Sequence, residues 1–192
     1  MEFKGRELIR KGYGEKNVLL LHGRGSDATD IISFAGSLGV KNCNFYAITA
    51  KGNAWYPNKF DIKKELNEPY LTESLELIDS FVREKDVKVI IGFSQGACLA
   101  LDYLKINKEV DVIALSGGFI GDDTEIEFSE KMDNNVFIGC SRQDPFIPIE
   151  RAEKSFEILK KNGCKIERYF YDVPGHSVSE YEFNFVKRFL DG

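Results

Sequence analysis

Short apolar runs alternate with longer amphipathic stretches along most of this chain, and this alternation restricts the fold more than any other feature. Between the runs, apolar residues recur at helical spacing, as in Leu71, Leu75 and Ile78. Strands that alternate with helices form βαβ units around a mostly parallel sheet. The sequence therefore predicts the α/β class, with a doubly wound, mostly parallel sheet flanked by helices. The expected strands are residues 18–21, 45–49, 87–92, 112–116, 136–140 and 166–171.

The predicted helices carry signals at their ends. Asn67 is a candidate cap for a helix over residues 71–84, with Pro69 in the first turn, where its missing N–H costs nothing. Ser177 and Glu180 have the spacing of a capping box for the last helix. That helix has an apolar stripe formed by Val178, Tyr181, Phe185 and Phe189. A further helix over residues 149–159 ends before Asn162 and Gly163.

The length and the cysteine content bound the organisation of the chain. It has 192 residues, which is the size of one domain, and no repeat, low-complexity tract or linker divides it. Residues 1–192 are therefore expected to form a single domain, in which residues 3–10 are a candidate edge strand. Four cysteines without metal-type spacing and only two histidines predict buried free thiols and no metal site.

The charge balance and the apolar segments limit the partners of the protein. The chain carries 26 Lys and Arg against 31 Asp and Glu, a formal net charge of -5, which disfavours binding to nucleic acids or anionic lipids. Its longest apolar runs, such as residues 18–21 and 89–91, are too short to cross a bilayer. The first residues lack the apolar region of a signal peptide. We expect a cytoplasmic protein without stable membrane insertion.

A G-x-S-x-G motif, residues 92–96, lies between an apolar strand and a predicted helix. A serine on such a tight turn presents its hydroxyl group at the end of the strand, and the flanking residues must be small because neighbouring backbone passes close. The alternative is a glycine-rich turn with a solvated serine. The strand-to-helix context favours Ser94 as a nucleophile.

A serine nucleophile needs a base, usually an imidazole, and this chain offers only two histidines. His22 follows the first long strand, upstream of the serine, and is interpreted as a structural histidine. In α/β sheets with this motif the order along the chain is serine, then acid, then histidine. That order selects His176, which lies in the loop before the last helix.

The carboxylate that orients the base should follow a strand between the serine and the histidine. Asp144 directly follows the strand at residues 136–140 and is the chosen candidate, although an ordinary Asp-Pro turn is the alternative. Asp111 precedes its strand, and Asp122 and Asp123 lie well beyond one. Asp172 ends a strand close to the histidine and is the reserve candidate.

Acyl transfer also needs donors for the negative charge that develops on the carbonyl oxygen. We assign this role to the backbone N–H groups of Gln95, at the start of a helix, and of Arg24, in the glycine-rich loop at residues 22–25. Phosphate binding by that loop is a weaker alternative, because neither G-x-G-x-x-G nor a P-loop lysine completes it. Trp55 and Tyr56 are candidate walls of an acyl pocket or residues that pack under a loop.

These segments together resemble the phospholipase/carboxylesterase family of the α/β-hydrolase superfamily, which includes acyl-protein thioesterases. The resemblance rests on residues 20–25, the motif at 92–96, Leu115-Ser116-Gly117-Gly118, Asp144-Pro145 and Gly175-His176. It covers nearly the whole chain and implies an α/β-hydrolase core; no stretch is long enough for a separate lid domain. Residues 55–57 and 67–70 look like those of a small bacterial and archaeal branch described as esterases.

The hypothesis from these residues is a serine hydrolase that cleaves small-molecule esters, or thioesters, of small or medium acyl groups through an acyl-enzyme. Ser94 attacks, His176 transfers the proton and Asp144 orients the imidazole. Neither a metal nor an organic cofactor is expected, and the resemblance allows a homodimer. Alternatives with the same three residues are a lactonase and a lysophospholipase. A further alternative is a non-catalytic module of the same fold that binds a small ligand.

Overall fold

A computed structural model describes residues 1–121, 128 and 132–192 of the chain. In these residues the strands form an eight-stranded sheet in the order β1-β2-β4-β3-β5-β6-β7-β8. The pairings β1–β2 and β2–β4 are antiparallel, and the other five pairings are parallel. The strands are β1 (Glu2–Phe3), β2 (Arg6–Lys11), β3 (Lys16–Leu21), β4 (Cys43–Ile48), β5 (Val89–Phe93), β6 (Asp111–Leu115), β7 (Asn135–Ser141) and β8 (Lys165–Tyr171).

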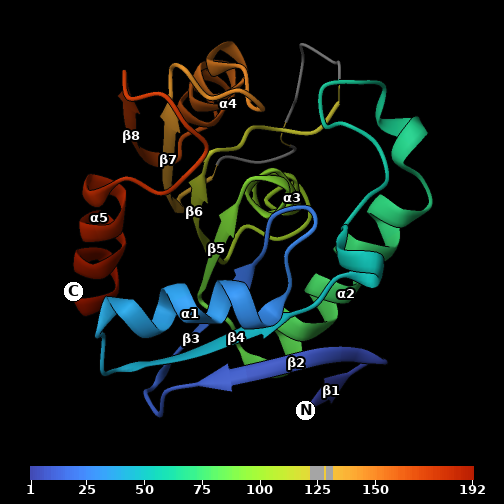
Figure 1. Cartoon of the computed structure of the whole chain (residues 1–192), viewed down its shortest axis with the longest axis vertical. Helices are drawn as coiled ribbons and strands as arrows, with labels where there is room; N and C mark the ends of the chain where they lie inside the picture. Colours follow the sequence, from blue (N-terminus) through green and yellow to red (C-terminus); the bar gives the residue numbers. More distant parts are fainter. Residues whose placement is uncertain (122–127, 129–131) are drawn as a thin grey trace.

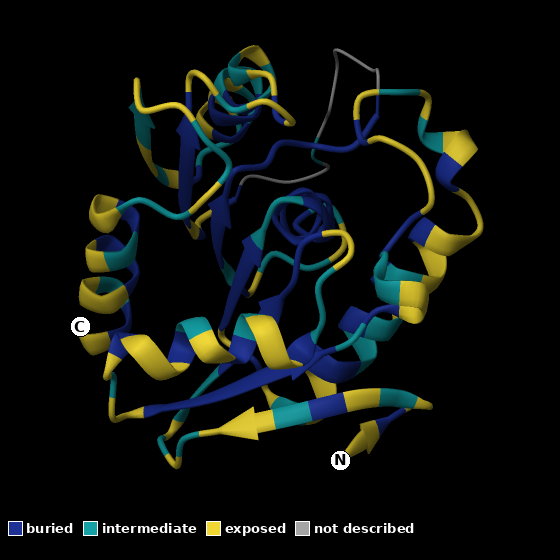
Figure 2. Cartoon of the chain, in the orientation of Figure 1, coloured by how far each residue is buried: buried dark blue, intermediate teal, exposed yellow. Residues whose placement is uncertain are grey.

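Helices cover both faces of this sheet, as a doubly wound fold requires (Figure 1). The described helices are α1 (Ala28–Leu38), α2 (Tyr70–Lys85), α3 (Gln95–Tyr103), α4 (Ile149–Lys161) and α5 (Glu180–Asp191), with short 3₁₀ helices η1 (Lys51–Asn53) and η2 (Lys64–Asn67). Side chains of α1 and α5 pack on one face of the sheet, and those of α2, α3 and α4 pack on the other. The central strands and α3 are almost entirely buried, whereas α1, α2, α4 and α5 expose one side (Figure 2).

The sequence-based strands are confirmed with shifts of one or two residues at their ends. All six expected strands are present. Apolar runs of this length suit the strands that are covered on both faces, whereas β8 is an edge strand with exposed charged residues. The candidate edge strand at residues 3–10 is instead a hairpin, since Lys4 and Gly5 both have positive φ and turn the chain between β1 and β2. The candidate acids Asp122 and Asp123 lie outside the described residues.

The order of the strands places a crevice at the carboxyl ends of β3 and β5. The chain leaves β3 through α1 and enters β4 on one side, then returns through α2 and enters β5 on the other side of β3. At such a point the two connections diverge, and ligands of open α/β sheets bind in the opening between them. The loop after β3 and the motif after β5 therefore meet at one edge of the sheet.

The cap that the sequence predicts for α2 is wrong. Asn67 does not cap α2; it is fully buried in η2, where its side chain bonds the backbone of Asn58 and Lys59. Pro69 occupies the N-cap position of α2. The loop around it thus needs the Asn67 amide as a partner for its own backbone.

The capping box of α5 also differs from the expected one. It is formed by Ser179 and Glu182, two residues later than Ser177 and Glu180. Both pairs have the same spacing, so the local pattern is ambiguous. Burial decides, because Glu182 is fully buried and its carboxylate receives the Ser179 backbone N–H and hydroxyl group at 2.6 and 2.7 Å.

In the described ranges, none of the helices combines the length and the apolar character needed to cross a bilayer. This agrees with the short apolar runs in the sequence.

The two serines provide a matched test of the α5 cap. Ser179→Ala should lower the free energy of unfolding by about 1 kcal/mol, because an N-cap acceptor is lost. Ser177→Ala should change it by less than about 0.5 kcal/mol, as expected of a surface substitution. Urea unfolding followed by circular dichroism measures both values, and a larger loss for Ser177→Ala would contradict the assignment.

Candidate active site

The G-x-S-x-G motif forms a sharp turn between β5 and α3. Ser94 has φ 54° and ψ -117°, a conformation that non-glycine residues rarely adopt and that signals local strain. A Cβ atom at Gly96 would lie 2.1 Å from the carbonyl oxygen of Leu21, and one at Gly92 would lie 2.3 Å from the carbonyl oxygen of Gly96. Gly96 therefore lets the turn approach the end of β3, and Gly92 lets the start of α3 lie close against β5.

The base and the acid that the sequence predicts are in contact. His176 Nδ1 and Asp144 Oδ2 are 2.7 Å apart, and the Asp144 side chain is fully buried. The other carboxylate oxygen of Asp144 accepts the backbone N–H groups of Phe146 and Ile147 at 2.8 and 3.0 Å. The carboxylate is thus held from both sides, and with Nδ1 donating to it, Nε2 of His176 is left as the basic nitrogen.

The reserve acid occupies a different position. The Asp172 side chain is 80% exposed and lies 4.0 Å from Arg142. Its backbone carbonyl accepts a hydrogen bond from Gln143. Of these two acids, Asp144 is the one in contact with His176.

Ser94 and His176 line the same cavity, which has a volume of about 350 Å³. The His176 ring contacts the rings of Phe93 and Phe146, with ring centroids 4.8 and 5.0 Å away. These two aromatic contacts restrict the tilt of the imidazole. The cavity therefore holds a hydroxyl group and an imidazole that is itself bonded to a buried carboxylate.

The two predicted oxyanion donors also line this cavity. Arg24 lies in the loop after β3, and Gln95 is the first residue of α3. Within the described part of the chain, neither backbone N–H donates to another protein group. Free N–H groups at the start of a helix attract negative charge.

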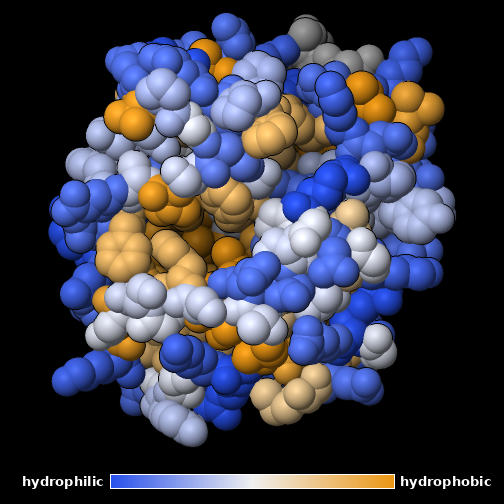
Figure 3. All heavy atoms as spheres, viewed as in Figure 1, coloured by the Kyte–Doolittle hydropathy of each residue, from blue (hydrophilic) through white to orange (hydrophobic). Residues whose placement is uncertain are grey.

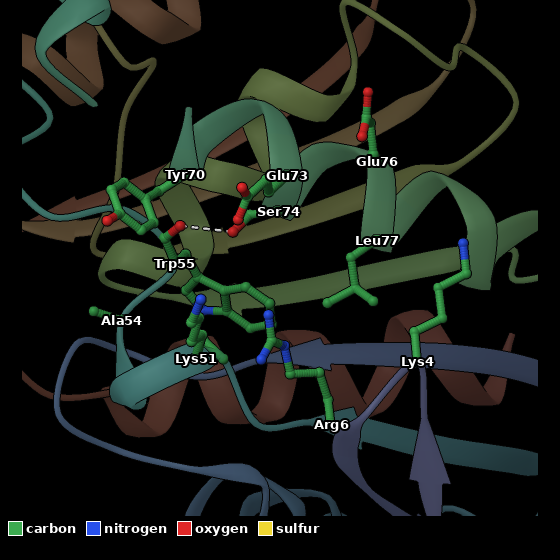
Figure 4. Close-up of a pocket in the computed structure, with 11 residues that line it drawn as sticks. Lys4, Arg6, Lys51, Ala54, Trp55, Tyr70, Glu73, Ser74, Glu76 and Leu77 are labelled. Atoms are coloured by element: carbon green, nitrogen blue, oxygen red, sulfur yellow. Dashed lines mark hydrogen bonds between the residues drawn. The ribbon is translucent and has the colours of Figure 1, made fainter. Parts of the chain in front are cut away.

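Trp55 and Tyr56, the two candidate pocket residues, have different surroundings. Tyr56 is among the residues that line the cavity with Ser94. Trp55 lines another hollow, of about 260 Å³, between the β1–β2 hairpin and α2 (Figure 4). Its indole N–H donates to the carbonyl oxygen of His22 at 2.9 Å, and its own carbonyl accepts from Ser74 at 2.6 Å.

His22 has the structural surroundings that the sequence predicts. Its ring is fully buried beside Trp55, with ring centroids 5.1 Å apart. Nε2 accepts the Ala50 N–H at 3.0 Å, so the hydrogen is on Nδ1, which lies 2.7 Å from the Gly23 carbonyl oxygen. Burial lowers the pKa of His22, and the contact with Gly23 opposes this only in part. A neutral imidazole thus joins the loop after β3 to the end of β4.

Sequence reasoning missed part of the cavity wall. Phe60, Phe146 and Ile147 line it together with Tyr56. Phe146 and Ile147 follow Asp144 so closely that they must lie near any site built on it, and this was the available signal. Phe60 lies in an irregular segment before η2 and carried no such signal.

A separate apolar hollow of about 200 Å³ lies between α1, the carboxyl ends of β5 and β6, and the segment that precedes α5 (Figure 3). Ile31, Phe34, Leu115 and Val178 line it, and Phe93 forms part of its wall. Phe93 also contacts His176, so this hollow lies behind the candidate site.

Comparison with known proteins identifies the family. Residues 9–192 match the Phospholipase/Carboxylesterase family. The chain belongs to that family. The crystal structure of a phospholipase/carboxylesterase from Dyadobacter fermentans is similar, with a TM-score of 0.88. The two sequences are 30% identical, and the match covers 99% of this chain and 98% of the Dyadobacter chain.

More distant relatives agree with this assignment. MhqD of Bacillus subtilis, provisionally named a hydrolase, is 23% identical over 92% of this chain and 93% of its own. The structure of Zea mays acyl-protein thioesterase 2 shares the fold, with a TM-score of 0.75 and 18% identity over 96% of each chain. This protein is thus a hydrolase of the phospholipase/carboxylesterase family.

The buried His22 predicts a dependence of stability on pH. Its pKa is lowered from 6.5 in the folded protein, so below about pH 6.5 the unfolded chain binds more protons and the free energy of unfolding falls. His22→Gln should reduce this loss when urea unfolding is compared at about pH 7.5 and pH 5.5. An NMR titration of the wild-type imidazoles checks the shift directly, and a pKa of 6.5 or above for His22 would contradict the assignment.

Proposed function

We propose that this protein hydrolyses carboxylic esters or thioesters of small or medium acyl groups by a serine mechanism. The observation that carries the proposal is the 2.7 Å contact between His176 Nδ1 and Asp144 Oδ2, with His176 and Ser94 lining the same cavity. A nucleophile, a base and an orienting acid are the parts that acyl transfer requires. Their order along the chain is the one typical of this fold.

In the proposed mechanism, Ser94 Oγ attacks the carbonyl carbon while His176 Nε2 takes the hydroxyl proton. Asp144 stabilises the imidazolium that forms, and the backbone N–H groups of Gln95 and Arg24 bind the oxyanion. When the tetrahedral intermediate collapses, the bond to the leaving group breaks and His176 returns the proton to it. Water then attacks the acyl-enzyme with His176 again as the base, which releases the acid and restores Ser94.

The size of the cavity supports a small or medium acyl group. About 350 Å³ is near the lower end of the range for ligand sites. Phe60, Phe146 and Ile147 provide apolar surface, while Lys59 and Asp61 add charge to the lining. A non-catalytic binding module of the same fold is less well supported, because such a module has no need of a buried carboxylate bonded to the histidine.

The location and the assembly of the protein stay predictions. A cytoplasmic location is supported by its four cysteines, Cys43, Cys98, Cys140 and Cys164, which are all free and buried. A homodimer is compatible with the family and is tested by light scattering of the purified protein.

Replacement of the nucleophile tests the proposal. Ser94→Ala should lower kcat for p-nitrophenyl esters by at least about ten-thousand-fold, because the acyl-enzyme can no longer form. The assay uses esters from acetate to laurate, and the preferred chain length measures the depth of the cavity. Equal activity of the two proteins would contradict the proposal, as would a wild type that neither hydrolyses any of these esters nor reacts with a serine-directed phosphonate at Ser94.

Two aspartates provide a matched test of the acid. Asp144→Asn should lower kcat by about 10³-fold to 10⁴-fold, because the amide favours the wrong imidazole tautomer. Asp172→Asn changes the same functional group on an exposed side chain and should alter kcat by less than about twofold. Steady-state kinetics with one ester measure both effects, and the reverse ranking would assign the role to Asp172.

A further inference from the structure

The Arg24 side chain binds the backbone of the loop that follows Trp55. Its guanidinium group donates to three successive carbonyl oxygens, those of Tyr56, Pro57 and Asn58, at 2.9, 2.8 and 2.6 Å. It also lies 6.0 Å from the centroid of the Tyr56 ring. Among the described residues Arg24 forms no ion pair. The guanidinium group is therefore committed to these backbone oxygens.

The Gln95 side chain binds the same loop from the opposite side of the crevice. Its amide is buried, donates to the Tyr56 carbonyl at 2.8 Å and accepts the Trp55 N–H at 2.9 Å. The Tyr56 carbonyl oxygen thus receives one hydrogen bond from Arg24 and one from Gln95. A carbonyl oxygen has two lone pairs, so its capacity is filled.

Arg24 and Gln95 are also the residues whose backbone N–H groups are the proposed oxyanion donors. They belong to connections that leave different strands, β3 and β5. Their side chains meet on one atom, the Tyr56 carbonyl oxygen, which sits in a loop that lines the cavity. This shared acceptor links the two halves of the proposed oxyanion hole.

We propose that the Arg24 side chain is a positioning residue for the oxyanion hole, which acts by tying the loop after β3 to Gln95 through the Tyr56 carbonyl. This inference rests on the proposed function. The reach of an oxyanion donor matters because these hydrogen bonds strengthen in the transition state, and small misplacements of a catalytic group are costly. Loss of the link should therefore lower kcat more than it raises KM.

Arginine suits this position for a geometric reason. A planar guanidinium group presents five N–H donors in a fixed fork and can serve several carbonyl oxygens at once. A lysine at residue 24 keeps the charge and the backbone N–H, but its single ammonium group cannot span the carbonyl oxygens of Tyr56, Pro57 and Asn58. Arg24→Lys therefore removes the planar guanidinium group but keeps the positive charge and the backbone N–H donor.

The test compares Arg24→Lys with Arg168→Lys, the same change on an exposed arginine of β8. With p-nitrophenyl esters, Arg24→Lys should lower kcat by about tenfold or more, with a smaller change in KM. Arg168→Lys should leave both constants within about twofold of wild type. Wild-type kcat in Arg24→Lys, or a change confined to KM, would overturn the inference.

Chemical rescue provides a readout that a general loss of stability would not change. In Arg24→Ala, methylguanidinium should raise kcat, whereas methylammonium should not. Trp55 is the only tryptophan of the chain, so its fluorescence emission reports on the loop without any substrate. It should shift in Arg24→Ala and return with methylguanidinium. Equal rescue by the two cations, or none, would overturn the role of the fork.

The outcome also distinguishes this inference from the proposed function. If wild type neither hydrolyses the esters nor reacts with a serine-directed phosphonate at Ser94, the proposed function fails and the inference fails with it. If wild type is active and Arg24→Lys equals it, only the positioning role fails.

Discussion

The backbone of the β5–α3 turn lies directly against the backbone at the end of β3, and the rest of the site depends on this contact. A side chain at Gly96 would collide with the carbonyl oxygens of Leu21 and His22. The contact sets the spacing between the strained Ser94 and the loop that carries Arg24. The surrounding parallel strands, buried on both faces, supply the rigidity that keeps Ser94 at positive φ.

Around this contact, buried polar groups connect segments that are distant in the sequence. His22 bonds the end of β4 through the Ala50 N–H, and its carbonyl holds the Trp55 indole. Gln95 then holds the backbone on either side of the Trp55–Tyr56 peptide. Unpaired polar groups at this depth would be costly, so each group is a constraint on its partner. The loop over the cavity is therefore ordered both by these hydrogen bonds and by the burial of the Trp55 and Tyr56 side chains in the core.

Local patterns were sufficient for most of the fold and misled at helix ends. Most strands contain short apolar runs, and the elbow is a short motif whose stereochemistry admits few alternatives, so both can be predicted from neighbouring residues. The cap of α5 could not, because Ser177 and Ser179 each precede a glutamate at the same spacing. Ser179 is the N-cap because Glu182 is buried and needs polar partners. Asn67 likewise bonds the backbone of Asn58 and Lys59 in the preceding loop instead of capping α2.

The sequence by itself determined the α/β architecture, the serine at the elbow and a short set of candidate acids and bases. Hydrophobic periodicity and backbone stereochemistry act over a few residues, and a chain with two histidines leaves little choice. Only the tertiary structure decided that Asp144 reaches His176, that Trp55 faces the hollow beside α2, and that two side chains share the Tyr56 carbonyl. The hydrogen bonds among these contacts join residues 32 to 39 positions apart, and their geometry follows from strand register and loop paths that no local pattern encodes.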